Sequence, residues 1–170
     1  GTVVYENTTT NPATPQWTRT ITNGKITNLA GVVFNHYGTR TVKQTAGVST
    51  LLLADNIYEI TSGNHTITKS DGSSLSVTVV EPLIKKYACS HISQGQLDLQ
   101  GSVLDGILDY GNNTCDNLAT YTHSNGNVYN VILYLLWKDY PFFCCYFLEL
   151  QWAMVKKMIK WFSWIYRWEF

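Results

Sequence analysis

The fold of this chain is indicated most clearly by residues 65–79, which read His-Thr-Ile-Thr-Lys-Ser-Asp-Gly-Ser-Ser-Leu-Ser-Val-Thr-Val. Apolar and polar residues alternate on both sides of Asp71-Gly72. Alternation with a period of two is typical of a half-buried β-strand, and Asp-Gly between two such runs is a strong hairpin signal. The apolar residues of the second run then share one face of a sheet: Leu75, Val77 and Val79.

Similar patterns lie on both sides of this hairpin. The paired runs are residues 118–122 with 128–133 around Asn125-Gly126 and, more weakly, residues 17–21 with 25–27 around Asn23-Gly24. Residues 38–45 and 96–99 also alternate, and no sustained helical period precedes Leu133. Many short strands with frequent turn signals predict an all-β, antiparallel domain over residues 17–133, either a β-sandwich or barrel-like.

The segment before this domain, residues 1–16, is expected to be loose. It contains Pro12 and Pro15 in a stretch rich in Thr and Asn, and chain ends are commonly poorly ordered. Residues 1–133 carry a formal charge of −2. A domain this close to neutral lacks the basic footprint of a nucleic-acid-binding protein, so we expect no nucleic-acid partner.

Two cysteines, Cys89 and Cys115, lie within the predicted domain. They can form a disulfide, which would stabilise the fold by about 3–4 kcal/mol on the loop-entropy model, or remain two reduced core thiols. Strands rich in Thr and Asn, with little Lys and Glu, favour an exported protein and hence the disulfide. The neighbouring pair Cys144-Cys145 is not expected to bridge, because adjacent Cβ vectors usually point apart.

Candidate catalytic and metal-binding residues are sparse. The four histidines, His36, His65, His91 and His123, show no metal-ligand spacing. Cys115 beside Asp116 could act as a nucleophile with His91, although a disulfide explains Cys115 more simply. Oxygen-bearing side chains gather around one loop and could serve calcium, but their spacing fits no EF-hand, and such residues also cap turns: Asp105, Asp109, Asn112 and Asp116. We therefore expect no catalytic residues, no metal and no cofactor, and leave calcium at this loop open.

A resemblance to a known group rests on residues 108–119, which read Leu-Asp-Tyr-Gly-Asn-Asn-Thr-Cys-Asp-Asn-Leu-Ala, followed by Asn-Gly-Asn-Val-Tyr at residues 125–129. This stretch resembles the C-terminal ending of uncharacterised surface or periplasmic lipoproteins of the Bacteroidota. Weaker matches extend the resemblance over about residues 17–133: Pro82-Leu83 with Tyr87-Ala88-Cys89, and residues 38–41 with Ala46-Gly47. It implies export, a β fold and pairing of Cys89 with Cys115. It implies no reaction, and Asn113 stands where the pattern has Gly.

The composition of the chain changes after Leu133. Residues 134–170 contain no Gly and no Thr, and they hold 14 of the chain's 23 Phe, Tyr and Trp residues. The run from Tyr140 to Val155 is apolar but is too short and too interrupted to span a membrane as a helix. From residue 151 on, a helix would carry a cationic stripe beside tryptophans. The residues expected to touch a membrane surface or a partner are Trp152, Lys156, Lys160, Trp161, Trp164, Arg167 and Trp168.

Three interpretations of residues 134–170 stay open. The segment can be an amphipathic helix in a membrane interface, a helix packed on the domain or on a partner, or a stretch that does not belong to the natural protein. The sequence as a whole predicts an exported, non-enzymatic structural or binding module at the cell surface or in the periplasm. Its partner is an unknown protein or glycan. The alternative is a membrane-associating protein that acts through residues 151–170.

Overall fold

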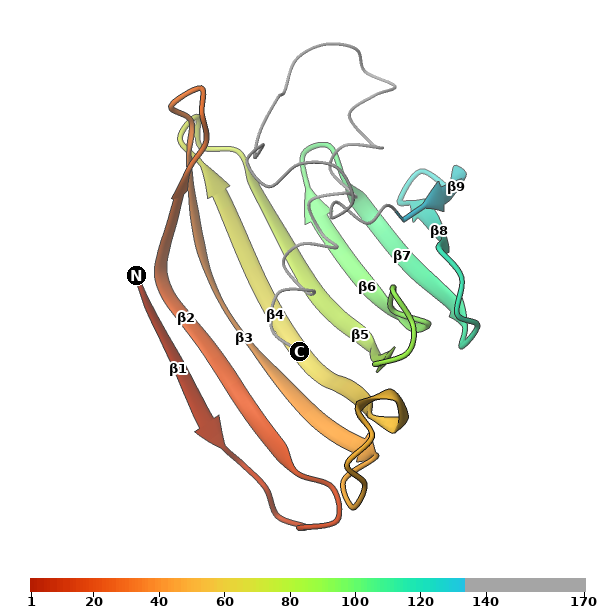
Figure 1. The fold of residues 1–170 in the computed structure, drawn as a ribbon. Coiled ribbons are helices and arrows are strands. Elements are labelled where there is room, and N and C mark those ends of the chain that lie inside the picture. Colours follow the sequence, from red (N-terminus) through yellow and green to blue (C-terminus); the bar gives the residue numbers. More distant parts are fainter. Residues whose placement is uncertain (134–170) are drawn as a thin grey trace.

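The computed structural model describes residues 1–133, which form a nine-stranded antiparallel sheet in the order of the sequence (Figure 1). Each strand pairs with the next along the chain, and a 3-10 helix, Leu53–Asp55, lies in the connection between β3 and β4. The strands are β1 (Thr2–Asn7), β2 (Gln16–Thr27), β3 (Val33–Ala46), β4 (Ile57–Lys69), β5 (Ser74–Lys86), β6 (Gln94–Gly101), β7 (Asp105–Asn112), β8 (Leu118–His123) and β9 (Val128–Ile132).

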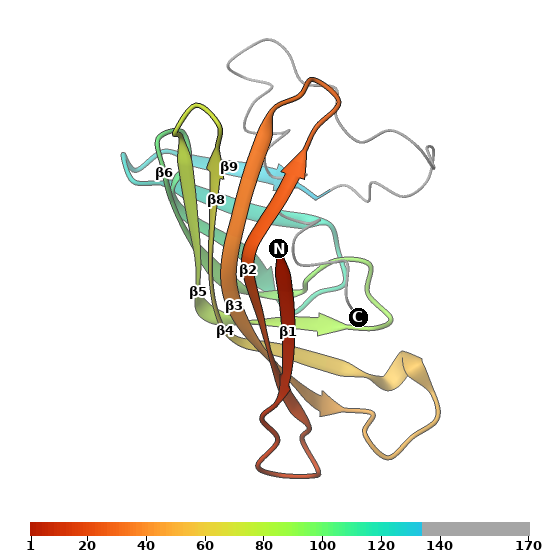
Figure 2. The same ribbon diagram turned by 90° about the vertical axis from the view of Figure 1, so that its left-hand side faces the viewer.

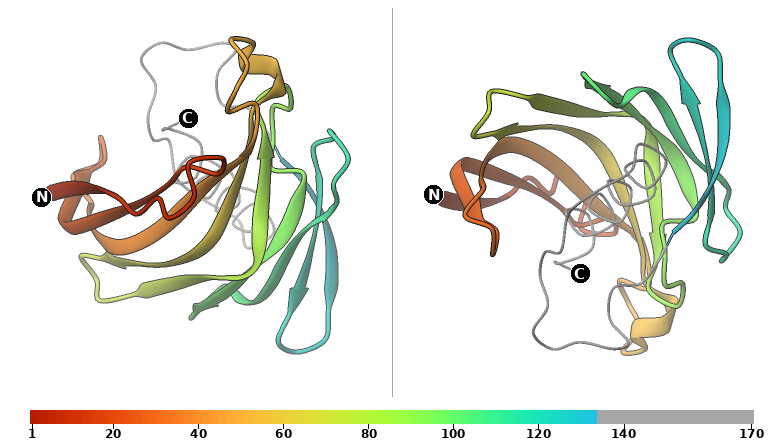
Figure 3. Two further views of the ribbon diagram at one scale, coloured as in Figure 1. Left: turned by 90° about the horizontal axis from the view of Figure 1, so that it is seen from below. Right: turned by 90° about the horizontal axis from the view of Figure 1, so that it is seen from above.

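The sheet is strongly twisted and curved. Figures 2 and 3 show the strands following an arc, so that the sheet has a concave inner face and a convex outer face. A right-handed twist is inherent in β-strands and accumulates across a sheet of many strands. The prediction of an all-β, antiparallel fold is confirmed. Among the described residues the strands form one continuous sheet, and the helical extension expected beyond Leu133 lies outside them.

The hairpin at residues 65–79 is confirmed. It consists of the end of β4, a turn and the start of β5, with Gly72 at φ +87°. Gly126 adopts a similar φ of +88° in the predicted turn between β8 and β9. Glycine reaches positive φ without steric cost, which is why these two turns could be read from the sequence.

The alternation along the strands gives the inner face an apolar core. Strand pairing carries this core across the sheet: Leu97 lies opposite Leu108, and Leu108 lies opposite Tyr121. All three side chains are almost completely buried. The core continues on the neighbouring strands through Val42, Ile60, Leu75, Val77, Leu83, Leu99, Tyr110, Ala119 and Val131.

The outer face carries hydroxyl and amide side chains that pair across strands. Thr18 and Thr41 lie 3.1 Å apart through their hydroxyls, and Thr20 and Thr39 lie 3.2 Å apart. Farther along the sheet, Gln96 donates to the Asp109 carboxylate at 2.9 Å. Cross-strand pairs of this kind add roughly 0.2–1 kcal/mol each.

The weak hairpin expected around Asn23-Gly24 is absent, because β2 runs continuously through both residues. Pairing with β3 passes from Ile21 opposite Gly38 to Gly24 opposite His36. Thr22 and Asn23 therefore lie opposite Tyr37 alone, which is a β-bulge. Asn23 has φ +55°, a left-handed conformation that Asn tolerates better than most residues. The Asn-Gly signal thus marks a bulge within a strand.

The N-terminal residues also differ from expectation. Thr2–Asn7 form β1, which pairs with β2 from Thr2 opposite Thr22 to Asn7 opposite Trp17. The sequence Thr-Val-Val-Tyr is rich in β-formers, and the exposed strand edge of β2 offers it backbone partners. Within residues 1–16, only Gly1 and residues 8–15, between β1 and β2, lack strand structure.

Candidate functional site

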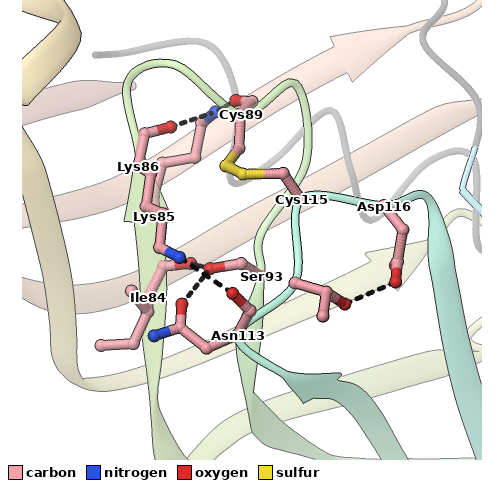
Figure 4. The surroundings of a disulfide bond; sticks show 9 residues. Ile84, Lys85, Lys86, Cys89, Ser93, Asn113, Cys115 and Asp116 are labelled. Carbon is pink, nitrogen blue, oxygen red and sulfur yellow. Dashed lines mark hydrogen bonds between the residues drawn. A yellow bond between two sulfur atoms is a disulfide. The ribbon is translucent and has the colours of Figure 1, made fainter.

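A disulfide between Cys89 and Cys115 joins the loop after β5 to the loop before β8 (Figure 4). The two Cα atoms lie 5.3 Å apart, a separation that suits a bridge. The pairing implied by the Bacteroidota resemblance is thus present in the structure. Because disulfides persist in oxidising compartments, this one hints at an exported protein.

Asn113, which replaces the Gly of that resemblance, fits its position. It adopts φ +72°, a left-handed conformation that Asn accepts more readily than other non-glycine residues. Its Oδ1 lies 2.8 Å from Ser93 Oγ, and its carbonyl accepts a hydrogen bond from Lys86 Nζ at 2.8 Å (Figure 4). The side chain and backbone of Asn113 therefore fasten the β7–β8 loop to the strands beside the disulfide.

The carboxylates of the proposed calcium loop bind groups of the protein. Asp109 accepts hydrogen bonds from Gln96 and from the Gly111 amide, and Asp116 accepts from the Thr114 hydroxyl and the Leu118 amide. Those two bonds lower the pKa of Asp116. Among residues 1–133, no three His, Cys, Asp or Glu side chains come together as a potential metal site.

The nucleophile considered at Cys115 is not available as a thiol, because its sulfur is in the disulfide. The residues expected to contact a membrane or a partner, from Trp152 to Trp168, lie outside the described residues, and that prediction stays open. In the part of the chain that the structure describes, no helix has the length and hydropathy needed to cross a membrane.

A group of basic side chains missed by sequence reasoning lies on the inner face of β2, β3 and β4. Arg19 and Arg40 are direct partners in the β2–β3 register, and both are buried, with 6% and 2% of their surface exposed. His65 on β4 is 1% exposed, and its Nδ1 lies 3.1 Å from Nε2 of His36 on β3. We call these four residues the cationic cluster.

Gly38 makes room for this cluster. It lies opposite His65 in the β3–β4 register and has φ +153°. A Cβ atom added to Gly38 would lie 2.4 Å from His65 Nδ1 and 2.4 Å from the Asn64 carbonyl oxygen, which is far inside van der Waals contact. Any side chain at this position would therefore displace the imidazole that meets His36.

The charge of the cluster at neutral pH comes from its two arginines. Burial lowers the pKa of His65 to about 3, and His36, Arg19 and Arg40 add to this effect. Burial, followed by the charge of Arg19, also lowers the pKa of His36. Both imidazoles are then neutral, whereas the guanidiniums stay charged.

The carboxylates of the nearby strands lie on the other face. Glu6 lies opposite Thr18, and Glu59 lies opposite Lys43, both in outer-face positions. Asp98 and Asp109 likewise alternate with the buried leucines of β6 and β7. Among residues 1–133, the strand alternation therefore keeps these carboxylates off the inner face, where Arg19, Arg40 and His65 have further interactions within the protein.

A sequence signal for the cluster does exist. The tripeptide Thr-Arg-Thr is found at residues 18–20 and again at residues 39–41, and in both the arginine occupies the apolar phase of the alternation. Trp17, Ile21 and Val42 share that phase. Two charged residues in positions that the pattern reserves for the core are unusual and point to a special role.

Comparisons with protein-family models, with curated proteins and with solved structures found no match to this chain. The resemblance to Bacteroidota lipoproteins accordingly stays a prediction.

Proposed function

We propose that residues 1–133 form a non-enzymatic binding module of an exported protein, at the cell surface or in the periplasm, and that its inner face binds an anionic amphiphile. The observation that carries this proposal is the buried arginine pair, with its two histidine neighbours, at one end of a mostly apolar face. The disulfide supports export, and the loss of Cys115 as a thiol favours binding over catalysis.

The arginine pair selects for an anion. Arg19 and Arg40 each interact with other groups of the protein, and the several N–H donors of a guanidinium can also serve a further anion. Guanidinium groups present planar, paired donors that match a carboxylate or phosphate. Arg19 and Arg40 lie side by side on neighbouring strands, about 5 Å apart by ordinary strand spacing. One carboxylate can therefore be held between them.

The surroundings of the cluster select for an apolar chain attached to that anion. His65 lies opposite Val77, and Val77 lies opposite Leu99, so the row that begins at the cluster continues as core residues. On the other side, Trp17 and Tyr58 pack edge to face with ring centroids 6.1 Å apart. A long-chain carboxylate that entered this buried face would place its head near the arginines and its tail along the apolar rows.

The test measures binding of palmitate and of 1-hexadecanol to the full chain by calorimetry. Because only palmitate carries a charge, we expect it to bind at least about tenfold more tightly, in line with hydrogen bonds to charged groups. Equal affinities, or no palmitate binding, would overturn the proposal. This comparison uses the unaltered protein and does not depend on any variant folding.

A pair of variants then locates the site. Arg40→Met should lower palmitate affinity about tenfold or more and leave hexadecanol binding nearly unchanged. Lys43→Gln, on the outer face of the same strand, is the matched control and should bind palmitate like the unaltered protein. Thermal melting of both variants checks that they fold. Palmitate affinity that is the same in folded Arg40→Met and Lys43→Gln would exclude the cluster as the binding site.

A further inference from the structure

The outer face holds a second feature, an open hollow over β2, β3 and β4. The lining residues that strand alternation places on the outer face are Thr20, Thr22, Lys25, Asn35, Tyr37, Thr39 and Asn64. Ile21, Asn23, His36 and Gly38 complete the lining. The side chain of Tyr37 is exposed over about half its surface, at 52%. His36 of the cationic cluster also lines the hollow, whereas Arg19 and Arg40 do not.

The bulge in β2 shapes this hollow. Thr22 and Asn23 together lie opposite Tyr37, so β2 and β3 depart from regular pairing at this level. Bulges redirect side chains and are frequent beside binding sites. The next level of the sheet is regular, with Thr20, Thr39 and Asn64 in one row across three strands.

The polar side chains of the row are held in place. The Thr20 and Thr39 hydroxyls lie 3.2 Å apart, the Thr39 hydroxyl also donates to the Arg19 carbonyl, and Asn64 Nδ2 donates to the Thr78 hydroxyl at 3.3 Å. A hydroxyl has one donor and two acceptor positions, and an amide has two of each, so these groups keep capacity for a ligand. Fixed side chains lose little entropy on binding.

We propose that this hollow binds an acidic glycan. A sugar ring has one apolar face and a rim of hydroxyls, which suits an exposed tyrosine ring surrounded by threonine and asparagine. Among the lining residues in the described chain, Lys25 is positively charged and there is no Asp or Glu. The positive charge of this lining favours a sugar that carries a carboxylate, such as a uronic acid.

The experiment titrates the full chain with tetragalacturonate and with cellotetraose, a neutral oligosaccharide of the same length. We expect the acidic sugar to bind at least about fivefold more tightly, consistent with one exposed charge contact of up to ~1 kcal/mol. Tyr37→Ala should lower affinity for both sugars about tenfold, whereas Tyr37→Phe should retain the affinity because the ring remains. Tyr87→Ala, which removes another half-exposed tyrosine outside the hollow, is the control.

Lys25→Gln should abolish the preference for the acidic sugar without lowering affinity for the neutral one. If the unaltered protein bound neither sugar, or if Tyr37→Ala bound both sugars as tightly as the unaltered protein, the hollow would not be a sugar-binding site. Equal affinity for both sugars would overturn the acidic assignment. Arg40→Met serves as a cross-check, because it should not change sugar binding. The outcome here is thus independent of whether palmitate binds the inner face.

Discussion

The two faces of the sheet use the same nine strands for different purposes. Inner-face residues such as Leu83, Leu97 and Leu108 are fully buried, whereas outer-face threonines are exposed or half-buried and bond across strands. Because side chains alternate, each strand contributes to both faces at once. The contrast teaches that stability comes mainly from one face, which leaves the other to vary in its surface chemistry.

Two features depart from this pattern of an apolar inner face and a polar outer face. The inner face, which should be apolar, contains Arg19, Arg40 and His65 in buried positions. The outer face, which should be a plain polar surface, has a hollow around Tyr37. Both lie on β2–β4, whereas β5–β8 follow the simple pattern, with buried apolar residues inside and mainly polar residues outside. The chemistry of the domain therefore concentrates in its N-terminal half.

The largest expected loss of stability comes from a substitution in the purely apolar part of the inner face. Leu97 is fully buried between β5 and β7 partners. Leu97→Ala removes buried carbon atoms and leaves a cavity, so it should lower the free energy of unfolding by about 2–5 kcal/mol. The measurement is urea denaturation followed by circular dichroism.

The matched variant on the outer face is Thr122→Ala. Thr122 is exposed on β8, so its replacement should cost no more than about 0.5–1 kcal/mol. If both variants lost equal stability, the two faces would not differ in the way that their burial indicates.

The next effect concerns the bridge that closes one end of the sheet. The double variant Cys89→Ser/Cys115→Ser removes the covalent link between two loops whose cysteines are 26 residues apart in the sequence. It should lower the free energy of unfolding by about 3 kcal/mol, and the melting temperature by about 10 °C. Calorimetry with and without reductant measures this. Reductant should destabilise the unaltered protein and leave the double variant unchanged; an unaltered protein that resists reductant in the unfolded state would contradict the bridge.

Much of the fold could be predicted because it depends on local rules. Alternation and Asp71-Gly72 specify a hairpin within a short stretch of chain, and Gly126 marks another. The errors arose where a local signal had two meanings. Asn23-Gly24 suits a turn and also a bulge, and only the pairing of β2 with β3 decides between them.

The candidate sites were less accessible to prediction because they depend on register. His36 and His65 are 29 residues apart, and nothing in the sequence states that their rings meet. The meeting requires β3 and β4 to pair with Gly38 opposite His65. Similarly, the sequence shows Tyr37 only as a strand residue, and its place in the hollow depends on the bulge in β2. Only Arg19 and Arg40, which occupy apolar positions of the alternation, mark one of the two sites in the sequence, and they do not indicate its ligand.

The smallest of the three effects tests how the cluster sets the pH response of the domain. In the folded state, burial, His36, Arg19 and Arg40 lower the pKa of His65 to about 3. In the unfolded chain the pKa is near its usual value of about 6.5. The unfolded state therefore binds more protons at acidic pH, and stability falls as pH drops from 6.5 towards 3. By pH 5 the loss from His65 is roughly 2 kcal/mol.

His65→Gln should remove most of this dependence, so that unfolding free energies at pH 7 and pH 5 differ by about 2 kcal/mol less than in the unaltered protein. Thr66→Val, which changes the adjacent outer-face residue of β4, should preserve the full dependence. No charged side chain reaches His65 from its β5 partner, Val77, so the arginines and His36 are the groups to vary next. A pH dependence that is the same in both variants would mean that His65 takes up a proton in the folded state as easily as in the unfolded chain. The inner face would then tolerate a third positive charge, which contradicts the burial that distinguishes it from the outer face.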